Sequence, residues 1–209
     1  MCASKFCASQ QILDRFWRAS RASKSCIKFS KILEKLVANR LAEFLKRFQV
    51  LFKHQYGFQK NFSTIHPIVH FLNHIAEANN NKEFIIAIFC DLTKAFDTVN
   101  HDILFKKLHY YGIRGVSLDW FKSYLSGRKQ CVAIGNSLSS YLPIDIGVPQ
   151  GSVLGPILFL LYINDLPNAT EMLPFLFADD TTAVASGPNL PQLFQKVNHE
   201  FHKLGEWFR

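Results

Sequence analysis

Two features that would indicate a membrane or secreted protein are missing from this sequence. There is no run of the roughly 20 apolar residues that a membrane-spanning helix needs, and the longest apolar stretch, Val153–Ile163, is short and contains Pro156. The apolar core of a signal peptide is also missing, because basic residues interrupt the first segment: Arg15, Arg18, Arg21 and Lys24. We therefore expect a soluble protein without membrane contact, located inside the cell in the cytoplasm or the nucleus.

Closely spaced cysteines are missing as well. The five cysteines form no Cys-x-x-Cys pair, and their odd number without a secretory signal indicates reduced thiols. His66, His70 and His74 follow one another at helical spacing and in principle offer metal ligands, yet no cysteine or acidic residue accompanies them at ligand spacing. A partly exposed helix face is the favoured interpretation, and the sequence does not indicate a zinc site.

The sequence is rich in apolar side chains and uneven in charge. Hydrophobic residues make up 48% of the 209, with 20 Phe, which argues for a folded core from about residue 30 onward. Residues 1–60 hold 13 Lys/Arg against 3 Asp/Glu, whereas residues 61–209 hold 11 against 13. This split suits polyanion binding by the first part and cation binding by the second. A solvated basic helix face is the alternative explanation for the first part.

Hydrophobic periodicity predicts alternating helices and strands after a segment, residues 1–29, that has no clear period and that we expect to be poorly ordered. Ser63 or Thr64 can cap the second helix, and Ser152 can cap a buried apolar one. The predicted helices begin or lie at Ser30–Phe48, Ile65–Ile75, about Lys94–Tyr111, Leu118–Leu125, Val153–Leu166 and Leu190 to the end. The predicted strands are Phe84–Cys90, the hairpin arms Val132–Ile134 and Leu142–Ile146, and the hairpin arms Leu173–Leu176 and Thr181–Ala185.

Two adjacent carboxylates occur in the run Phe177-Ala178-Asp179-Asp180, between the apolar arms of the last hairpin. Neighbouring acids on a half-buried hairpin repel one another, so stability alone does not explain them. They either hold a hard divalent cation such as Mg²⁺ or form a solvated Asp-Asp turn, and the tetrapeptide alone does not decide. Asp91 follows the buried strand directly; if the strands are neighbours, three carboxylates converge in the ligand set of a two-metal site.

Phe96 and Asp97 lie close behind Asp91. If a helix begins near Lys94, Phe96 lies one turn above the metals and could stack on a sugar or base, and ordinary helix-to-sheet packing is an equal alternative. Asp97 is either a supporting acid or a solvated one.

Three ordered motifs resemble those of reverse transcriptases of the non-LTR (LINE-like) retrotransposon class. The run from Phe89 to His101 is similar to the first catalytic motif, Gly147–Pro156 to the second, and Phe177–Asp180 to the third. Tyr56-Gly57-Phe58 and Ser63-Thr64 resemble the fingers segment of the family. The resemblance covers about residues 30–209, and three motifs in the family order are far more specific than one.

The resemblance implies an α+β fold, with a right-hand polymerase palm of antiparallel sheet backed by helices and with mostly helical, partial fingers. It implies that Asp91 and Asp179 hold two Mg²⁺ ions and that Asp180 is the third active-site carboxylate. Phe96 resembles the bulky gate against a ribose 2′-OH, and Gln150 and Gly151 are expected along the incoming nucleotide and template. The implied partners are an RNA template, a DNA primer and deoxynucleoside triphosphates.

The sequence departs from the family in three places. Ser25-Cys26-Ile27-Lys28-Phe29 replaces a basic Arg-Pro-Ile segment that contacts the triphosphate, and Gln59 replaces an Arg. The chain ends at Arg209, before the lysine-bearing palm motif and the thumb of the family. We therefore expect residues 30–209 to be a truncated fingers–palm domain, incomplete or weakly active alone, and residues 1–29 to reflect a frameshift or a truncated reading frame.

Two further hypotheses stay open beside an RNA-directed DNA polymerase. One is a non-catalytic nucleic-acid-binding remnant that uses the basic N-terminal part, with salt-dependent RNA binding as its expected property. The other is an Mg²⁺-dependent nuclease, because the same metal pair could activate water. The Pro149-Gln150-Gly151 loop gives the nuclease no support.

Overall fold

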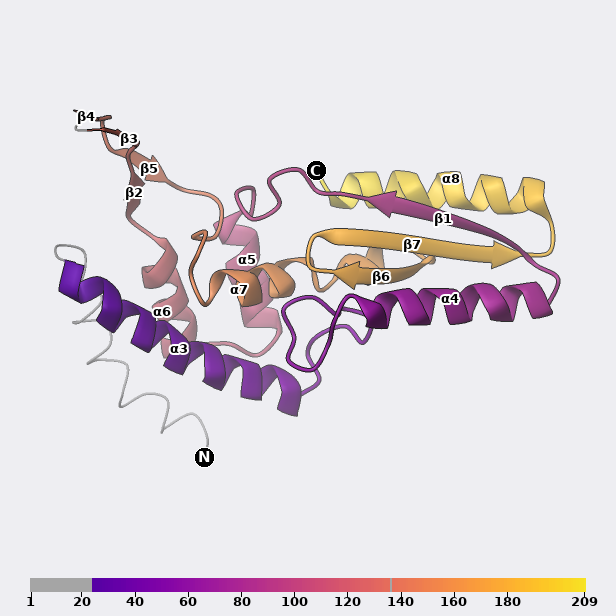
Figure 1. Ribbon diagram of the computed structural model, residues 1–209, viewed down its shortest axis with the longest axis horizontal. Coiled ribbons are helices and arrows are strands. Elements are labelled where there is room, and N and C mark those ends of the chain that lie inside the picture. Colours follow the sequence, from indigo (N-terminus) through magenta and orange to yellow (C-terminus); the bar gives the residue numbers. More distant parts are fainter. Residues whose placement is uncertain (1–23, 136) are drawn as a thin grey trace. The chain divides into compact units, whose positions relative to one another are not determined.

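The computed structural model describes residues 24–135 and 137–209, with side chains from Ser30 onward (Figure 1). The expected disorder of residues 1–29 therefore falls mainly outside the described residues. The chain divides into two compact units: the first holds the residues up to Phe48 together with Phe96–Tyr162, and the second holds Gln49–Ala95 and Ile163–Arg209. Both units combine helices with antiparallel strands, so the α+β class is confirmed at this level.

A three-stranded antiparallel sheet forms the centre of the second unit. Its strands are β1 (Phe84–Cys90), β7 (Asp180–Gly187) and β6 (Leu173–Phe177), in the spatial order β1-β7-β6. All three were predicted, because continuous apolar and β-branched runs bounded by polar turns are typical of buried strands. The central strand β7 follows β6 through a short turn and pairs with β1, which comes about 90 residues earlier in the chain.

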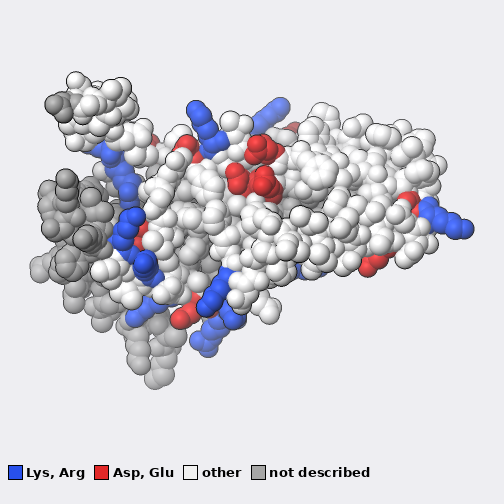
Figure 2. All heavy atoms as spheres, in the orientation of Figure 1, with Lys and Arg blue, Asp and Glu red and all other residues white. Residues whose placement is uncertain are grey.

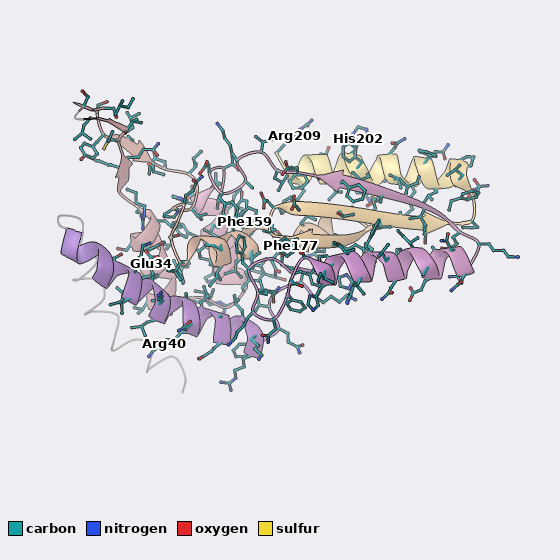
Figure 3. The ribbon with its side chains drawn as sticks, viewed as in Figure 1. Glu34, Arg40, Phe159, Phe177, His202 and Arg209 are labelled. Atoms are coloured by element: carbon teal, nitrogen blue, oxygen red, sulfur yellow. The ribbon has the colours of Figure 1, made fainter. Side chains whose placement is uncertain are left out.

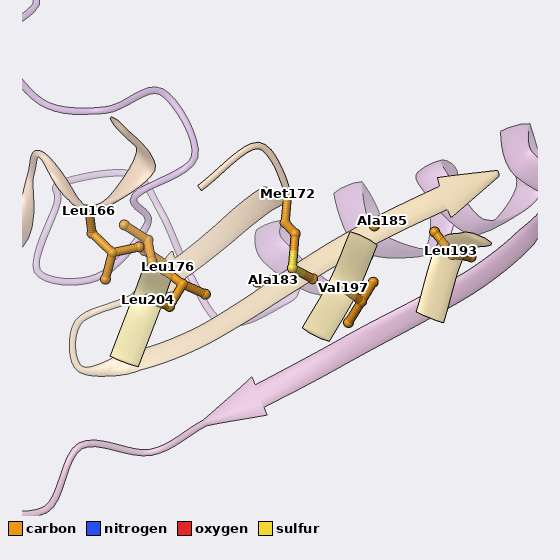
Figure 4. Close-up of a cluster of buried hydrophobic side chains, with 8 residues drawn as sticks. All are labelled: Leu166, Met172, Leu176, Ala183, Ala185, Leu193, Val197 and Leu204. Atoms are coloured by element: carbon orange, nitrogen blue, oxygen red, sulfur yellow. The ribbon is translucent and has the colours of Figure 1, made fainter. Parts of the chain in front are cut away.

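Helices α4 (Ile65–Asn80) and α8 (Leu190–Trp207) lie on opposite sides of this sheet (Figure 1). Because successive side chains of a strand point to opposite faces, Ala183 and Ala185 face α8, whereas Val184 lies in the cluster beside α4. The prediction that β1 is covered on both faces is confirmed only in part, because Ile85–Ile88 are half-buried whereas Phe84 and Phe89 are 49% and 71% exposed. The buried cluster on the α8 side is drawn in Figure 4 and consists of Leu166, Met172, Leu176, Ala183, Ala185, Leu193, Val197 and Leu204.

Two of the three histidines of α4, His66 and His70, have partners within the protein. The Tyr56 hydroxyl and His70 Nδ1 are 2.9 Å apart, and His66 Nδ1 accepts a hydrogen bond from the Ser63 backbone N–H at 3.1 Å. The helix begins where the sequence predicts, although the side chain of Thr64 makes no capping hydrogen bond. These contacts support the helix-face interpretation of the histidine series.

The first unit is built on α3 (Lys24–Arg47), α5 (His101–Tyr110), α6 (Val116–Leu125) and α7 (Gly155–Ile163). Helix α3 begins before the predicted Ser30, and it buries Val37, Leu41 and Leu45 along one face. Helix α7 is buried nearly all round, as expected from its apolar sequence, and a short 3₁₀ helix, Leu166–Ala169, follows it in the second unit. No helix in the described ranges is both long and apolar enough to cross a membrane.

Two helix starts differ from the prediction. Helix α5 begins at His101 rather than near Lys94, because Asn100 caps it by accepting hydrogen bonds from the backbone N–H groups of Asp102 and Ile103. Lys94 itself has a left-handed φ of 57°, which no helix tolerates in its interior. Helix α7 begins at Gly155 rather than Val153, and the Ser152 hydroxyl accepts from the Gly155 N–H at 2.9 Å, as its expected capping role requires.

The pairing of the exposed hairpin was also predicted wrongly. Strand β3 (Ala133–Ile134) pairs with β4 (Ser137–Leu138), whereas β5 (Leu142–Ile144) pairs with β2 (Arg128–Gln130). These strands are only two or three residues long and mostly exposed, so they carry no burial pattern from which a register could be inferred.

Candidate active site

The acidic pair occupies the tightest turn of the second unit. Strand β6 ends at Phe177, β7 begins at Asp180, and these two residues form the closing pair of the hairpin, so Ala178 and Asp179 alone make the turn. Ala178 has a left-handed φ of 57°, the conformation that fits a two-residue hairpin to the twist of its strands. A residue with a Cβ adopts that conformation at a cost of about 1–2 kcal/mol. The turn therefore presents Asp179, half-buried, and Asp180, exposed, at the end of the sheet; Figure 3 labels Phe177 just before them.

Asp91 lies at the same end of the sheet. The register of β1 and β7 pairs Cys90 with Thr181. Asp91 follows Cys90 directly and Asp180 precedes Thr181, so both acids lie at this end of the β1–β7 pair. The condition stated in the sequence analysis, that the strands ending in acids are neighbours, is therefore met, since β1 and β7 are adjacent.

The chemistry of this end of the sheet suits a hard cation. Carboxylate oxygens are the ligands that Mg²⁺ takes. Among the described side chains, those of residues 30–135 and 137–209, no Lys, Arg or His forms an ion pair with Asp91, Asp179 or Asp180. The three side chains share one end of the sheet without closing into a ligand cluster, because no group of three or more metal-binding side chains is gathered in the described part of the chain. The donor set fits a divalent ion, and the expected convergence of all three carboxylates is not seen.

Phe96 lies in an irregular segment of the first unit and not in a helix. Its ring packs on Phe159 with 4.4 Å between ring centroids, and its carbonyl accepts a hydrogen bond from the Val148 N–H at 2.8 Å. The expected helical placement is wrong because the helix starts only after Asn100. The contact with Phe159 is a packing contact with helix α7, not the helix-to-sheet packing that was the alternative.

The loop with Gln150 and Gly151 is attached to the same irregular segment. Gln150 Nε2 donates to Asp97 Oδ1 at 2.9 Å, and the Gly147 N–H donates to the Val99 carbonyl at 2.7 Å. Both Gln150 and Gly151 are exposed, and Gly151 has a left-handed φ of 74° that suits a glycine. Phe96, Gln150 and Gly151 thus form one group in the first unit, and the three acids form another in the second.

Two buried polar residues that the sequence did not single out contact these groups. Glu34, on α3 and 6% exposed, accepts a hydrogen bond from the Val153 N–H at 2.9 Å, just after the Gln150 loop; Figure 3 labels it. Gln55 is 2% exposed and contacts the turn of Ala178. A polar residue that is buried through contacts with distant segments leaves no periodic signal, and only its position beside a motif could have drawn attention to it.

Comparison with known proteins gives a consistent result. A family model described as "Reverse transcriptase (RNA-dependent DNA polymerase)" matches residues 20–207. The "Probable RNA-directed DNA polymerase from transposon BS" of Drosophila melanogaster is 38% identical over 192 residues, which cover 85% of this chain and 20% of that protein. The "RNA-directed DNA polymerase from mobile element jockey" of the same fly is 32% identical over 186 residues, with the same coverage. The chain thus spans about a fifth of the length of these curated relatives.

Proposed function

The chain belongs to the reverse transcriptase (RNA-dependent DNA polymerase) family, and from this premise we propose that it carries the catalytic site of a polymerase from a LINE-like retrotransposon. The reaction is attack of a primer 3′-OH on the α-phosphate of a deoxynucleoside triphosphate, directed by an RNA template. A new phosphodiester bond forms, pyrophosphate leaves and the hydroxyl proton is released. The adjacency of β1 and β7, which places Asp91, just after β1, at the same end of the sheet as Asp179 and Asp180, is the observation that carries this proposal.

We assign the second unit to the palm of a right-hand polymerase. Its antiparallel sheet has helices on both faces and ends in the acidic residues, which suits a rigid support for a catalytic site. In this proposal residues 30–209 form a fingers–palm domain, and the mostly helical fingers include helices of the first unit and the segment 56–64 of the second unit.

The proposed metal ligands are Asp91 and Asp179, with Asp180 as the third carboxylate of the site. Two Mg²⁺ ions held there would lower the pKa of the attacking hydroxyl and neutralise charge on the phosphates. The protein itself would contribute position, because the turn of two residues fixes where Asp179 stands relative to the end of β1.

Three residues of the first unit are assigned to the substrates. We propose that Phe96 restricts access for a ribose 2′-OH, and that Gln150 and Gly151 contact the incoming nucleotide and the template. The exposure of Gln150 and the hydrogen bond that orients its amide toward Asp97 support its role. The proposed partners are an RNA template, a DNA primer and deoxynucleoside triphosphates.

The test is primer extension on an RNA template with Mg²⁺, using the full chain and its Asp179→Asn and Asp91→Asn variants. Each substitution keeps the side-chain shape and removes the charge, and extension should fall by about 100-fold or more. The exposed Asp119 of α6 provides the control, because its pair with Lys122 spans 3.6 Å at the surface and is worth little. Asp119→Asn should extend primers like the parent chain. Extension that survives in the Asp91 or Asp179 variants would refute the assignment.

A second candidate function is nucleic-acid binding without catalysis, which the exposed basic side chains of α3 favour. They are Lys31, Lys35, Arg40, Lys46 and Arg47, and Lys and Arg side chains stand out along this helix in Figure 2. A binding remnant would hold RNA with an affinity that falls steeply with salt, equally in the parent chain and in Asp91→Asn, and would incorporate no nucleotide. Charge reversal at Lys31 and Lys35 should weaken that binding.

A further inference from the structure

A short segment before α4 runs beside the strand that leads into the acidic turn. The Leu176 N–H donates to the His54 carbonyl at 2.9 Å, and the Tyr56 N–H donates to the Leu176 carbonyl at 2.8 Å. These two hydrogen bonds form a parallel bridge between Gln55 and Leu176, so the backbone on both sides of Gln55 is fixed to β6. Gln55 is thereby held beside Leu176, which lies two residues before Ala178, the first residue of the turn.

The Gln55 side chain bonds directly to that turn. Its Oε1 atom accepts hydrogen bonds from the Ala178 N–H at 3.1 Å and from the Gly57 N–H at 2.8 Å. Only the oxygen of an amide can accept, so the two donors fix the orientation of the group. Its Nε2 atom has no hydrogen-bond partner among the residues that the structure describes. The Oε1 acceptor, rather than the Nε2 donor, therefore makes the contact between this side chain and the turn.

The turn needs such a contact because of its conformation. Ala178 is only 5% exposed and has a left-handed φ, so its N–H is buried and would be costly to leave without an acceptor. Gly57 also lies very close to the turn, since a Cβ added to Gly57 would lie 2.2 Å from the Ala178 nitrogen. The segment Gln55–Gly57 thus touches the first residue of the turn on two sides.

We propose that Gln55 is a positioning residue that holds the Ala178 turn and thereby sets the direction of the Asp179 and Asp180 carboxylates. It acts through the Ala178 N–H and bonds neither to the acids nor to a substrate. Its effect on catalysis rests on the proposed polymerase function, whereas its effect on the turn does not.

The turn itself is tested by amide hydrogen exchange, measured residue by residue by NMR on the full chain. Gln55→Met keeps the length of the side chain but removes the acceptor, so the Ala178 N–H should exchange about 10-fold faster or more. The Leu176 N–H, which bonds to the His54 backbone, serves as the internal reference and should keep its protection. Gln55→Glu keeps two acceptor oxygens and should leave Ala178 protected.

Unchanged exchange at Ala178 in a folded Gln55→Met variant would overturn the proposal. If that variant does not fold, Gln55→Glu carries the test, because fast exchange at Ala178 despite its carboxylate would equally overturn it. Neither measurement depends on polymerase activity, so a parent chain without activity would refute the proposed function and leave the turn contact to be decided by exchange.

Catalysis provides the second measurement. Substitution of a group that supports metal ligands typically lowers metal affinity or activity by about 10–100-fold. Gln55→Met should therefore lower kcat and raise the half-saturating Mg²⁺ concentration within that range. The KM for the deoxynucleotide should change little, and Gln55→Glu should restore most of kcat. Gln195→Met, the same substitution at an exposed position of α8, is the control. A change confined to the nucleotide KM, or a loss that Gln55→Glu does not restore, would contradict positioning through the turn.

Discussion

Gln150 donates a hydrogen bond to Asp97 over 2.9 Å, although 53 residues separate them in the chain. The backbone repeats this connection, because the Val148 N–H donates to the Phe96 carbonyl at 2.8 Å. Two segments that we assign to nucleotide contact, those of Phe96 and Gln150, are therefore held together as one group before any substrate binds.

Removing the acceptor from this pair should weaken nucleotide binding. In Asp97→Ala the Gln150 amide loses its orienting partner, and a hydrogen bond worth about 1 kcal/mol predicts that the KM for the deoxynucleotide rises severalfold. Asp97→Asn keeps an oxygen acceptor and should restore the parent value. Asp145→Ala, at an exposed acid of the same unit, is the control in steady-state primer extension. Equal KM values in all variants would show that Asp97 does not contribute to nucleotide binding.

Gly57 should tolerate no side chain. An added Cβ would lie 2.2 Å from the nitrogen and 2.8 Å from the Cα of Ala178, both backbone atoms that can move only together with the turn. We expect Gly57→Ala to lower the free energy of unfolding by about 1–3 kcal/mol or more. Gly205 of α8 has no atom within 4 Å of an added Cβ, so Gly205→Ala should stabilise by about 0.5–1 kcal/mol. Urea unfolding measures the free energy of unfolding of both variants. Destabilisation of equal size in Gly57→Ala and Gly205→Ala would point to a general effect of the methyl group.

Glu34 should matter more than the other acid on its helix. Glu34→Ala leaves the half-buried Val153 N–H without its acceptor and should cost about 1–3 kcal/mol of folding free energy. Burial raises the pKa of the neighbouring Tyr124 to about 12, so the phenol stays neutral near this carboxylate. Glu43→Ala, at an exposed site of α3, should change stability by less than about 0.5 kcal/mol. Similar urea midpoints for the two variants would show that the Val153 contact contributes nothing.

Glu200 should make stability depend on pH in the acid range. Burial by itself raises its pKa, but hydrogen bonds from Lys203, the Glu171 N–H and Thr170 outweigh burial and lower the pKa to about 2, from an ordinary 4.5. A lowered pKa contributes stability that is complete above pH 4.5 and is lost as pH falls toward 2. Unfolding measured between pH 5 and about 2 should therefore show a smaller pH dependence in Glu200→Gln than in the parent. The exposed Glu206 of the same helix is the control, since Glu206→Gln should leave the slope unchanged.

The elements that the sequence predicts well are those whose side chains report burial. The strand Phe84–Cys90 and the arms of the acidic hairpin were predicted because apolar runs end there in polar residues, and the neighbouring ends of these strands brought Asp91 to Asp180. The start of α5 was missed because a left-handed Lys94 and an Asn100 cap follow from local backbone geometry, which periodicity does not record.

The supports of the site could not be predicted in the same way. Gln55 and Ala178 are 123 residues apart in the chain, and Glu34 and Val153 are 119 apart. Each contact exists only after the helices and strands have packed, and a single polar residue within a mixed segment gives no sign that it will be buried. The sequence therefore singles out the acids, but it does not single out the buried polar residues Gln55 and Glu34, which contact Ala178 and Val153.

The acidic turn has only two residues between its closing pair, Phe177 and Asp180. One inserted residue would shift β7 by one position and exchange its two faces, so that Ala183 and Ala185 would leave the α8 side for the α4 side. Asp180 would be turned by the same shift. The length of this turn is therefore constrained both by the hydrophobic core and by the acids. Viable insertions should occur instead beside exposed residues such as Gly135.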